Sequence, residues 1–247
     1  MAETALLQLQ GLSISFGGLR AVQDVSLALP QDTLGALIGP NGAGKTTLFA
    51  LMSGFLRPDA GRVLFAGHDI TGRAPQLNAR DGLARTFQVV QPFAAQTVRE
   101  NIAVGAHLHL KSRRAALAAA EGVAEQLGLA PQLDKPAADL TVAGRKRLEL
   151  ARALATKPRL LLLDEVLAGL NPQEIGEMIP VVRRIAAGGV TVLMIEHVMQ
   201  AVMNLAQTVW VLAQGQLIAH GTPAEVTSDT RVIEAYLGPG ATARLAR

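Results

Sequence analysis

A glycine-rich stretch carries the strongest chemical signal in this sequence. Residues 39–47 read GPNGAGKTT and match the pattern G-x-x-x-x-G-K-[ST], between an apolar run and a helical pattern. Glycines allow main-chain N–H groups to turn inward around phosphate oxygens, and the positive end of the next helix points at the same place. We therefore expect a phosphate loop formed by Gly39, Pro40, Asn41, Gly42, Ala43, Gly44, Lys45, Thr46 and Thr47.

Two side chains of this phosphate loop have defined tasks in nucleotide chemistry. The Lys45 ammonium is expected to reach the β and γ phosphates of ATP, and the Thr46 hydroxyl is expected to bind Mg²⁺. The sequence thus predicts ATP and Mg²⁺ as cofactors. The alternative is a glycine turn with no ligand, which the combined fit of spacing and context disfavours.

Two carboxylates follow a second apolar run, LLLL at residues 160–163. Ligands bind at the carboxyl ends of strands in open α/β sheets, so Asp164 and Glu165 are expected at a binding edge. We expect Asp164 to hold the Mg²⁺ shell and Glu165 to polarise the attacking water as a general base. Alone, such acids also fit a solvated strand end, and it is the phosphate loop that favours chemistry.

The elements that must position these residues predict an α/β fold. Residues 6–16 and 25–29 alternate apolar and polar side chains, as half-buried antiparallel strands do. Residues 45–53 are expected to form a helix after the phosphate loop. The later chain indicates a parallel sheet covered by helices, with strands at 160–163, 190–195 and 208–212 and helices at 172–187 and 197–205.

The middle of the chain has a different character. Residues 97–154 are helical in pattern and include no strand candidate, and Thr97 with Glu100 forms a Thr-x-x-Glu capping box. We predict one ATPase domain over residues 1–240, with a core at 1–88 and 156–240, an inserted helical lobe at 89–155 and a loose tail at 241–247.

Composition narrows the function classes. Hydrophobic residues make up 49% of the chain and charged residues 17%, which favours a large buried core. No apolar run approaches the roughly 18 residues of a membrane span, and the first ten residues do not resemble a secretory signal. The absence of cysteine excludes a disulfide scaffold and a cysteine metal site. Aromatics are only 3%, which disfavours a base-stacking platform, so no nucleic acid partner is expected.

Further motifs, in their order along the chain, resemble the ATP-binding subunits of ABC transporters. LELARAL at 148–154 leads into LLLLDE, as a helix does in that family directly after its signature motif. The resemblance implies an α/β P-loop NTPase fold with a RecA-like parallel core sheet, an N-terminal antiparallel β subdomain and an inserted α-helical subdomain. It also implies that Gln88 in ARTFQ acts in catalysis and on Mg²⁺, that His197 in MIEH acts in catalysis, and that Phe16 in SFGG stacks on adenine.

In this family the signature segment serves ATP bound to the opposite subunit, which here makes Thr141 and Gly144 candidate nucleotide contacts. The segment reads TVAGR rather than SGGQQ, with Ala143 where the second glycine usually lies. Asn171 replaces the commoner aspartate of the D-loop, and Val166 replaces the proline common after the catalytic glutamate. These departures affect the expected contacts of the signature segment and the rate of ATP hydrolysis, but they leave the prediction of ATP binding unchanged.

Longer phrases resemble one branch of the family. FGGLRAV, ARTFQ, LDEVLAGLNP, MIEHVM and EAYLG are similar to the longer of the two paired ATPase subunits of bacterial branched-chain amino acid importers. The resemblance implies a heterodimer with a second ATPase, two membrane permeases and, indirectly, a solute-binding protein. It places the chain peripherally on the cytoplasmic face of the bacterial inner membrane, and residues 88–106 are the expected permease contact.

Three alternatives stay open at this point. The first is the ATPase of an ABC exporter or of a lipopolysaccharide-extraction system. The second is a soluble ABC ATPase, although such proteins usually carry a coiled coil, zinc cysteines or tandem ATPase domains. The third is a non-catalytic ATP-binding regulator, which the presence of both Glu165 and His197 disfavours.

Overall fold

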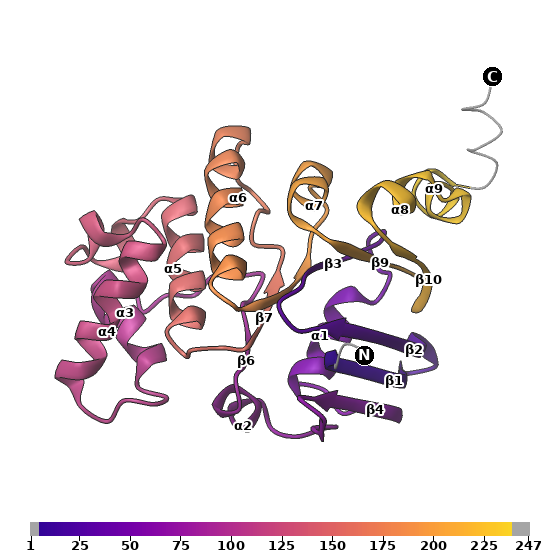
Figure 1. Ribbon diagram of the computed structural model, residues 1–247, viewed down its shortest axis with the longest axis horizontal. Helices are drawn as coiled ribbons and strands as arrows, with labels where there is room; N and C mark the ends of the chain where they lie inside the picture. Colours follow the sequence, from indigo (N-terminus) through magenta and orange to yellow (C-terminus); the bar gives the residue numbers. More distant parts are fainter. Residues whose placement is uncertain (1–4, 239–247) are drawn as a thin grey trace. The chain divides into compact units, whose positions relative to one another are not determined.

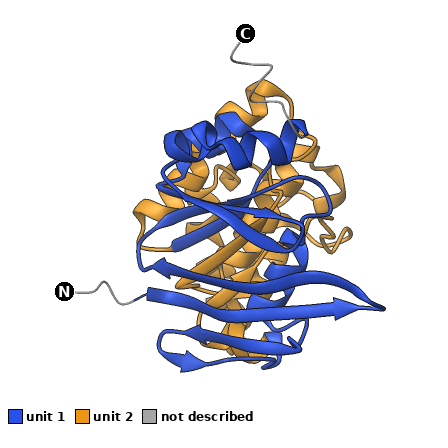
Figure 2. Cartoon of the chain, turned by 90° about the vertical axis from the view of Figure 1, so that its right-hand side faces the viewer, with its two compact units in different colours: residues 1–75, 191–247 blue, residues 76–190 orange. Residues whose placement is uncertain are grey.

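The computed structural model describes residues 5–238, so the tail predicted at 241–247 lies outside the described residues. Two units are distinguished by their internal contacts, one of residues 1–75 with 191–247 and one of residues 76–190. Figure 2 colours the first unit blue and the second orange.

The first unit contains an antiparallel sheet near the N-terminus. Its strands follow the order β2 (Leu19–Pro30), β1 (Ala5–Phe16), β4 (Ala60–Phe65) and β5 (His68–Asp69), and Figure 1 shows the three long strands side by side. The burial of β1 and β2 alternates, as predicted for strands with one packed face. The second strand is longer than the predicted 25–29, because its pairing with β1 continues down to the hairpin at Phe16 and Leu19.

The parallel part of the first unit is built around β3 (Leu34–Ile38). This strand pairs in parallel with β8 (Thr191–Ile195) on one side and β9 (Thr208–Ala213) on the other. Every residue of β3 and β8 is buried, as expected for central parallel strands. The remaining elements of this unit are β10 (Gln216–Gly221), which pairs antiparallel to β9, and helices α1 (Lys45–Ser53), α7 (Met199–Leu205), α8 (Pro223–Ser228) and α9 (Thr230–Leu237).

The second unit is mostly helical. Its strands β6 (Leu83–Arg85) and β7 (Leu160–Asp164) pair in parallel, and α2 (Pro75–Arg80) lies at its start. Figure 1 shows α3, α4 and α5 grouped together in magenta to pink. Its longer helices are α3 (Val98–Ala106), α4 (Arg113–Gln126), α5 (Val142–Leu154) and α6 (Pro172–Ala187), with short 3₁₀ turns at Ala130–Gln132 and Ala137–Asp139.

Side-chain caps explain where several helices begin. Thr97 at α3, Asn171 at α6 and Thr222 at α8 each form a capping box with the glutamate three residues later. The helix predicted at 197–205 begins instead at Met199, since Val198 is extended and supplies no side-chain cap. No strand was predicted for β10 and no helix for α9.

A stripe of alanines and one buried asparagine organise the helical lobe. Ala116, Ala120 and Ala124 of α4 are fully buried at a spacing of four residues, and α4 packs against α3. Asn101 of α3 is also fully buried and binds the chain before the helix through four hydrogen bonds of 2.9–3.3 Å, to the main chain of Phe93, Gln96 and Thr97.

Across residues 5–238, each helix is either too short or too polar to span a lipid bilayer.

We predict that Asn101→Ala lowers the free energy of unfolding by about 2–3 kcal/mol, because buried main-chain groups lose their partner. The urea midpoint of the purified chain measures the change. Asn204→Ala is the control, since Asn204 is exposed and bonds Gln200 O within α7, and its effect should stay below about 1 kcal/mol. Equal shifts for the two variants would contradict the assigned role of Asn101.

Candidate functional site

The phosphate loop lies between the end of β3 at Ile38 and the start of α1 at Lys45. Gly44 has φ 100° and stands at the helix N-cap, and a Cβ there would lie 2.3 Å from Ala21 O. A Cβ at Gly39 would lie 1.9 Å from Leu212 O. Main chain from β2 and β9 therefore closes in on the loop, and only glycine fits at both positions.

Lys45 is held inside the curve of the loop. The residue is only 8% exposed, and its Nζ donates hydrogen bonds to Gly39 O at 2.7 Å and to Pro40 O at 2.9 Å. The ammonium and the N-terminal end of α1 therefore both present positive charge at the loop, which is the arrangement that binds anions such as phosphate.

Main-chain bonds tie the phosphate loop to two hairpins. Gly215 N–H, in the turn after β9, donates to Ala43 O at 3.0 Å, and Gly215 O accepts from Gln23 N–H at 2.8 Å. Phe16 lies at the tip of the β1–β2 hairpin and is 47% exposed, so its ring can offer a face to a ligand.

His197 follows β8, whose Ile195 pairs in parallel with Leu37 of β3. In this register, His197 and Gly39 each come two residues after the paired position, so they leave the sheet at the same edge. The histidine is exposed. The structure thus brings the phosphate loop, Phe16 and His197 to one unit, on neighbouring strands and hairpins.

Asp164 is a buried carboxylate at the end of β7 in the second unit. It is 1% exposed, its Oδ2 lies 2.8 Å from Arg85 Nη2, and its main-chain N–H donates to Thr86 Oγ1 at 3.1 Å. Its other oxygen, Oδ1, is buried with no hydrogen-bond partner among the described residues. Mg²⁺ prefers hard oxygen ligands, so this unused carboxylate oxygen fits a magnesium shell.

Glu165 and Gln88 are brought together within the second unit. Gln88 Nε2 donates to Glu165 Oε2 at 2.7 Å. Glu165 has φ 49°, a left-handed conformation that is uncommon for a residue with a Cβ, and its carbonyl accepts from Lys146 Nζ at 3.2 Å. Sequence reasoning identified Asp164 and Glu165 but missed Arg85, which tertiary contact holds against Asp164, and Lys146, which binds the Glu165 carbonyl.

Thr141 and Gly144 lie at the start of α5. Thr141 is the N-cap, and its Oγ1 accepts from the Gly144 N–H at 3.1 Å. The Gly144 amide therefore already has a partner in this chain, while the Thr141 hydroxyl proton can still donate to a ligand. Thr141 is exposed and Gly144 is buried.

Tyr236 of α9 is a third residue that sequence reasoning missed. Burial raises the pKa of its hydroxyl above the ordinary value, against an opposing interaction with the main chain of Gly39. The C-terminal helix thus reaches the first glycine of the phosphate loop. The only sequence signal was the phrase EAYLG, which carries no chemistry by itself.

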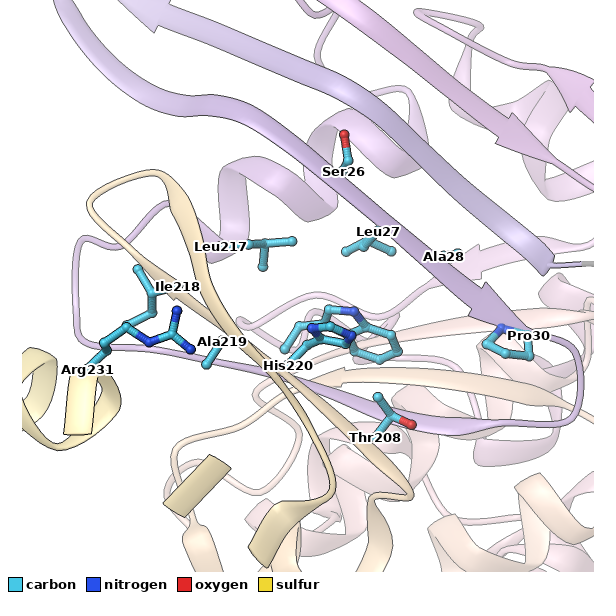
Figure 3. A pocket seen from close by; sticks show the side chains of 11 residues that line it. Ser26, Leu27, Ala28, Pro30, Thr208, Leu217, Ile218, Ala219, His220 and Arg231 are labelled. Carbon is cyan, nitrogen blue, oxygen red and sulfur yellow. The ribbon is translucent and has the colours of Figure 1, made fainter. Parts of the chain in front are cut away.

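A groove of about 730 Å³ lies elsewhere in the first unit, between β2, the β9–β10 hairpin and α9 (Figure 3). Trp210 and His220 are cross-strand partners on its wall, and Arg231 stands at its end. Asp229 pairs with Arg231 at 2.6 Å. With that charge compensated, the described lining residues include no unpaired guanidinium or ammonium group for an anionic ligand.

Comparison with known families gives two matches along the chain. A family model described as "ABC transporter" matches residues 22–168. A second, described as "Branched-chain amino acid ATP-binding cassette transporter", matches residues 216–238, which include β10, α8 and α9.

Curated relatives match nearly the whole chain. The high-affinity branched-chain amino acid transport ATP-binding protein LivG of Salmonella typhimurium is 40% identical, and that of Escherichia coli strain K12 is 39% identical. BraF of Pseudomonas aeruginosa, with the same description, is 38% identical. Each alignment covers 94% of this chain and 98% of the relative.

Solved structures of the same kind superpose closely. A nucleotide-free ATP-binding cassette from an ABC transporter matches with TM-score 0.86 and 32% identity, covering 94% of this chain and 99% of the other. An ATP-binding cassette in its ADP conformation matches with TM-score 0.87 and 32% identity, covering 95% and 99%. The α/β P-loop NTPase fold expected from the sequence is confirmed.

We predict that Gly44→Ala weakens ATP binding by about tenfold or more, because the left-handed conformation costs about 1–2 kcal/mol and Ala21 O must also move. Isothermal titration calorimetry with ATP measures the change. Gly122→Ala is the matched control, since Gly122 lies within α4 and its Cβ would meet no atom within 4 Å. It should leave the affinity unchanged and raise the unfolding free energy by about 0.5–1 kcal/mol. Comparable affinity losses in both variants would refute the steric assignment.

Proposed function

The chain belongs to the ABC transporter family as an ATP-binding, ATP-hydrolysing subunit, and we propose that it powers uptake of branched-chain amino acids or related small solutes through partner permeases. The observation that carries the proposal is a preformed phosphate loop, with Lys45 Nζ inside its curve, in a chain that matches LivG along 98% of the length of that protein. The match of residues 216–238 to the branched-chain family favours an importer over an exporter.

In the first unit, the phosphate loop is proposed to bind the phosphates of ATP. The main-chain N–H groups at the start of α1 face the anion, and Lys45 exchanges its two carbonyl partners for phosphate oxygens. Phe16 is proposed to stack on adenine, and His197 to orient the attacking water near the γ-phosphate.

In the second unit, Glu165 is proposed as the general base that takes a proton from the attacking water. Gln88, bonded to Glu165 at 2.7 Å, is proposed to hold that carboxylate in place and to sense the metal. The Oδ1 atom of Asp164 and the Thr46 hydroxyl are the proposed Mg²⁺ ligands. Bound Mg²⁺ would neutralise phosphate charge during phosphoryl transfer.

The signature segment lies at the start of α5, where Thr141 is exposed, and this position supports a partner ATPase. We propose a heterodimer with a second ABC ATPase, in which Thr141 and Gly144 serve the nucleotide of the other subunit. Three apolar side chains at residues 87–93 support a contact with a permease, since Phe87, Val89 and Phe93 are 46%, 69% and 45% exposed. Two permeases and, indirectly, a solute-binding protein complete the proposal, with this chain peripheral on the cytoplasmic face of a bacterial inner membrane.

Glu165→Gln should lower kcat for ATP hydrolysis by about 100-fold or more, because the amide cannot accept the proton that a general base removes. ATP affinity should stay within about twofold, since the amide keeps the size of the side chain and an oxygen that can still accept from Gln88. Single-turnover hydrolysis and equilibrium ATP binding separate the two effects. Wild-type turnover in this variant would exclude Glu165 as the base.

Lys45→Ala should weaken ATP binding by about 10–100-fold, because charge-assisted hydrogen bonds to the phosphates are lost. Calorimetry on the full chain checks the affinity. Lys111→Ala removes the same charge at an exposed position before α4 and should bind ATP as the wild type does. If Lys45→Ala retains wild-type affinity, the phosphate-loop assignment is wrong.

A further inference from the structure

One face of α5 carries three charged side chains at a spacing of three residues, namely Lys146, Glu149 and Arg152. This spacing puts them in a row along the helix. Lys146 and Glu149 are each only 8% exposed, and the Arg152 side chain is 25% exposed. Charged side chains are rarely buried so deeply without partners, so the contacts that hold them matter for what the helix does.

Lys146 binds the main chain of the residue proposed as the general base. Its Nζ donates to Glu165 O at 3.2 Å, and the same carbonyl accepts from the Ala168 N–H at 3.2 Å. The Glu165 backbone has φ 49°, which its own Cβ disfavours. A turn of this kind persists when its surroundings hold it, and the buried ammonium is such a support.

Glu149 and Arg152 bind the two ends of the segment that contains Gln88. The Phe87 N–H donates to Glu149 Oε1 at 3.2 Å, and Arg152 Nη1 donates to Gln91 O at 3.0 Å. The Arg152 guanidinium also lies 5.1 Å from the centre of the Phe93 ring. Burial raises the pKa of Glu149, against the opposing effects of the Phe87 N–H, Arg152 and Lys146.

We propose that α5 is a bracket in which Lys146 positions the Glu165 turn and Glu149, with Arg152, positions residues 87–93. The proposal rests on the proposed function, in which Glu165 and Gln88 act on the water that attacks ATP. The same helix begins at Thr141, in the segment assigned to the nucleotide of the partner subunit. A displacement of that helix end is therefore passed to both held segments, and neither Lys146 nor Glu149 needs to touch ATP.

Hydrogen exchange on the full chain tests the bracket without any hydrolysis. Lys146→Met should speed exchange of the Ala168 amide by about tenfold, and Glu149→Met should do the same for the Phe87 amide, because each loses a charged hydrogen bond. Each variant should leave the other amide within about twofold of the wild type. Lys111→Met, at an exposed lysine, is the matched control and should change neither amide.

An effect of each variant on only one of the two amides would distinguish two local contacts from a general destabilisation of the second unit. If both variants speed both amides equally, or if neither differs from Lys111→Met, the bracket does not exist and the proposal is overturned.

Steady-state kinetics of the full chain with its partner subunits test the consequence for hydrolysis. Lys146→Met should lower kcat by about tenfold with KM within about twofold, since it disturbs the base and not ATP binding. Lys146→Arg, which can still donate to the carbonyl, should recover kcat to within about threefold of the wild type. An unchanged kcat in Lys146→Met, or no recovery in Lys146→Arg, contradicts the positioning role.

The proposed function and the α5 bracket can be refuted separately. A wild-type chain that binds no Mg-ATP in calorimetry would refute the proposed function, while the exchange pattern at Ala168 and Phe87 would still decide whether α5 holds these segments.

Discussion

The first unit depends on one steric constraint, which is that residues 39–44 must turn between a buried strand and a helix with their main chain exposed to a ligand. Carbonyl oxygens of Ala21 and Leu212 approach so closely that Gly44 and Gly39 cannot carry a side chain. Those carbonyls belong to β2 and β9, so the antiparallel sheet and the parallel strands both shape the loop. The bond from Gly215 N–H to Ala43 O adds the β9–β10 turn to the same support. Strands β2 and β9 and the β9–β10 turn thus together fix the conformation of residues 39–44.

The second unit holds two adjacent acids, Asp164 and Glu165, in different environments at the end of β7. Asp164 is buried against Arg85, and one of its oxygens remains available to a hard cation. Glu165 is less buried, bonds Gln88 and has a left-handed backbone. Adjacent residues therefore have separate environments, which supports the proposed roles of Asp164 as a metal ligand and Glu165 as a proton acceptor. Buried charges from β6 and α5 maintain this difference.

The parts of the fold that local sequence encodes were predictable. The phosphate loop follows from glycine spacing, and the starts of α3, α6 and α8 follow from N-cap side chains and the acids three residues later. The sequence did not predict Lys146 on the Glu165 carbonyl or Arg85 on Asp164, because each contact joins segments 19 or 79 residues apart. The start of α7 was misplaced by two residues because Val198 lacks a capping side chain. The roles of all the candidate site residues remain predictions.

The alanine stripe of α4 has a mechanical consequence. Ala116, Ala120 and Ala124 are fully buried where α4 packs on α3, and alanine has no side-chain torsion that could change under load. A contact of this type cannot absorb a displacement by switching rotamers, as leucine or methionine contacts can. The α3–α4 contact therefore has little freedom to rearrange by side-chain rotation, and a permease that docks at residues 87–93, as proposed, would displace the two helices together.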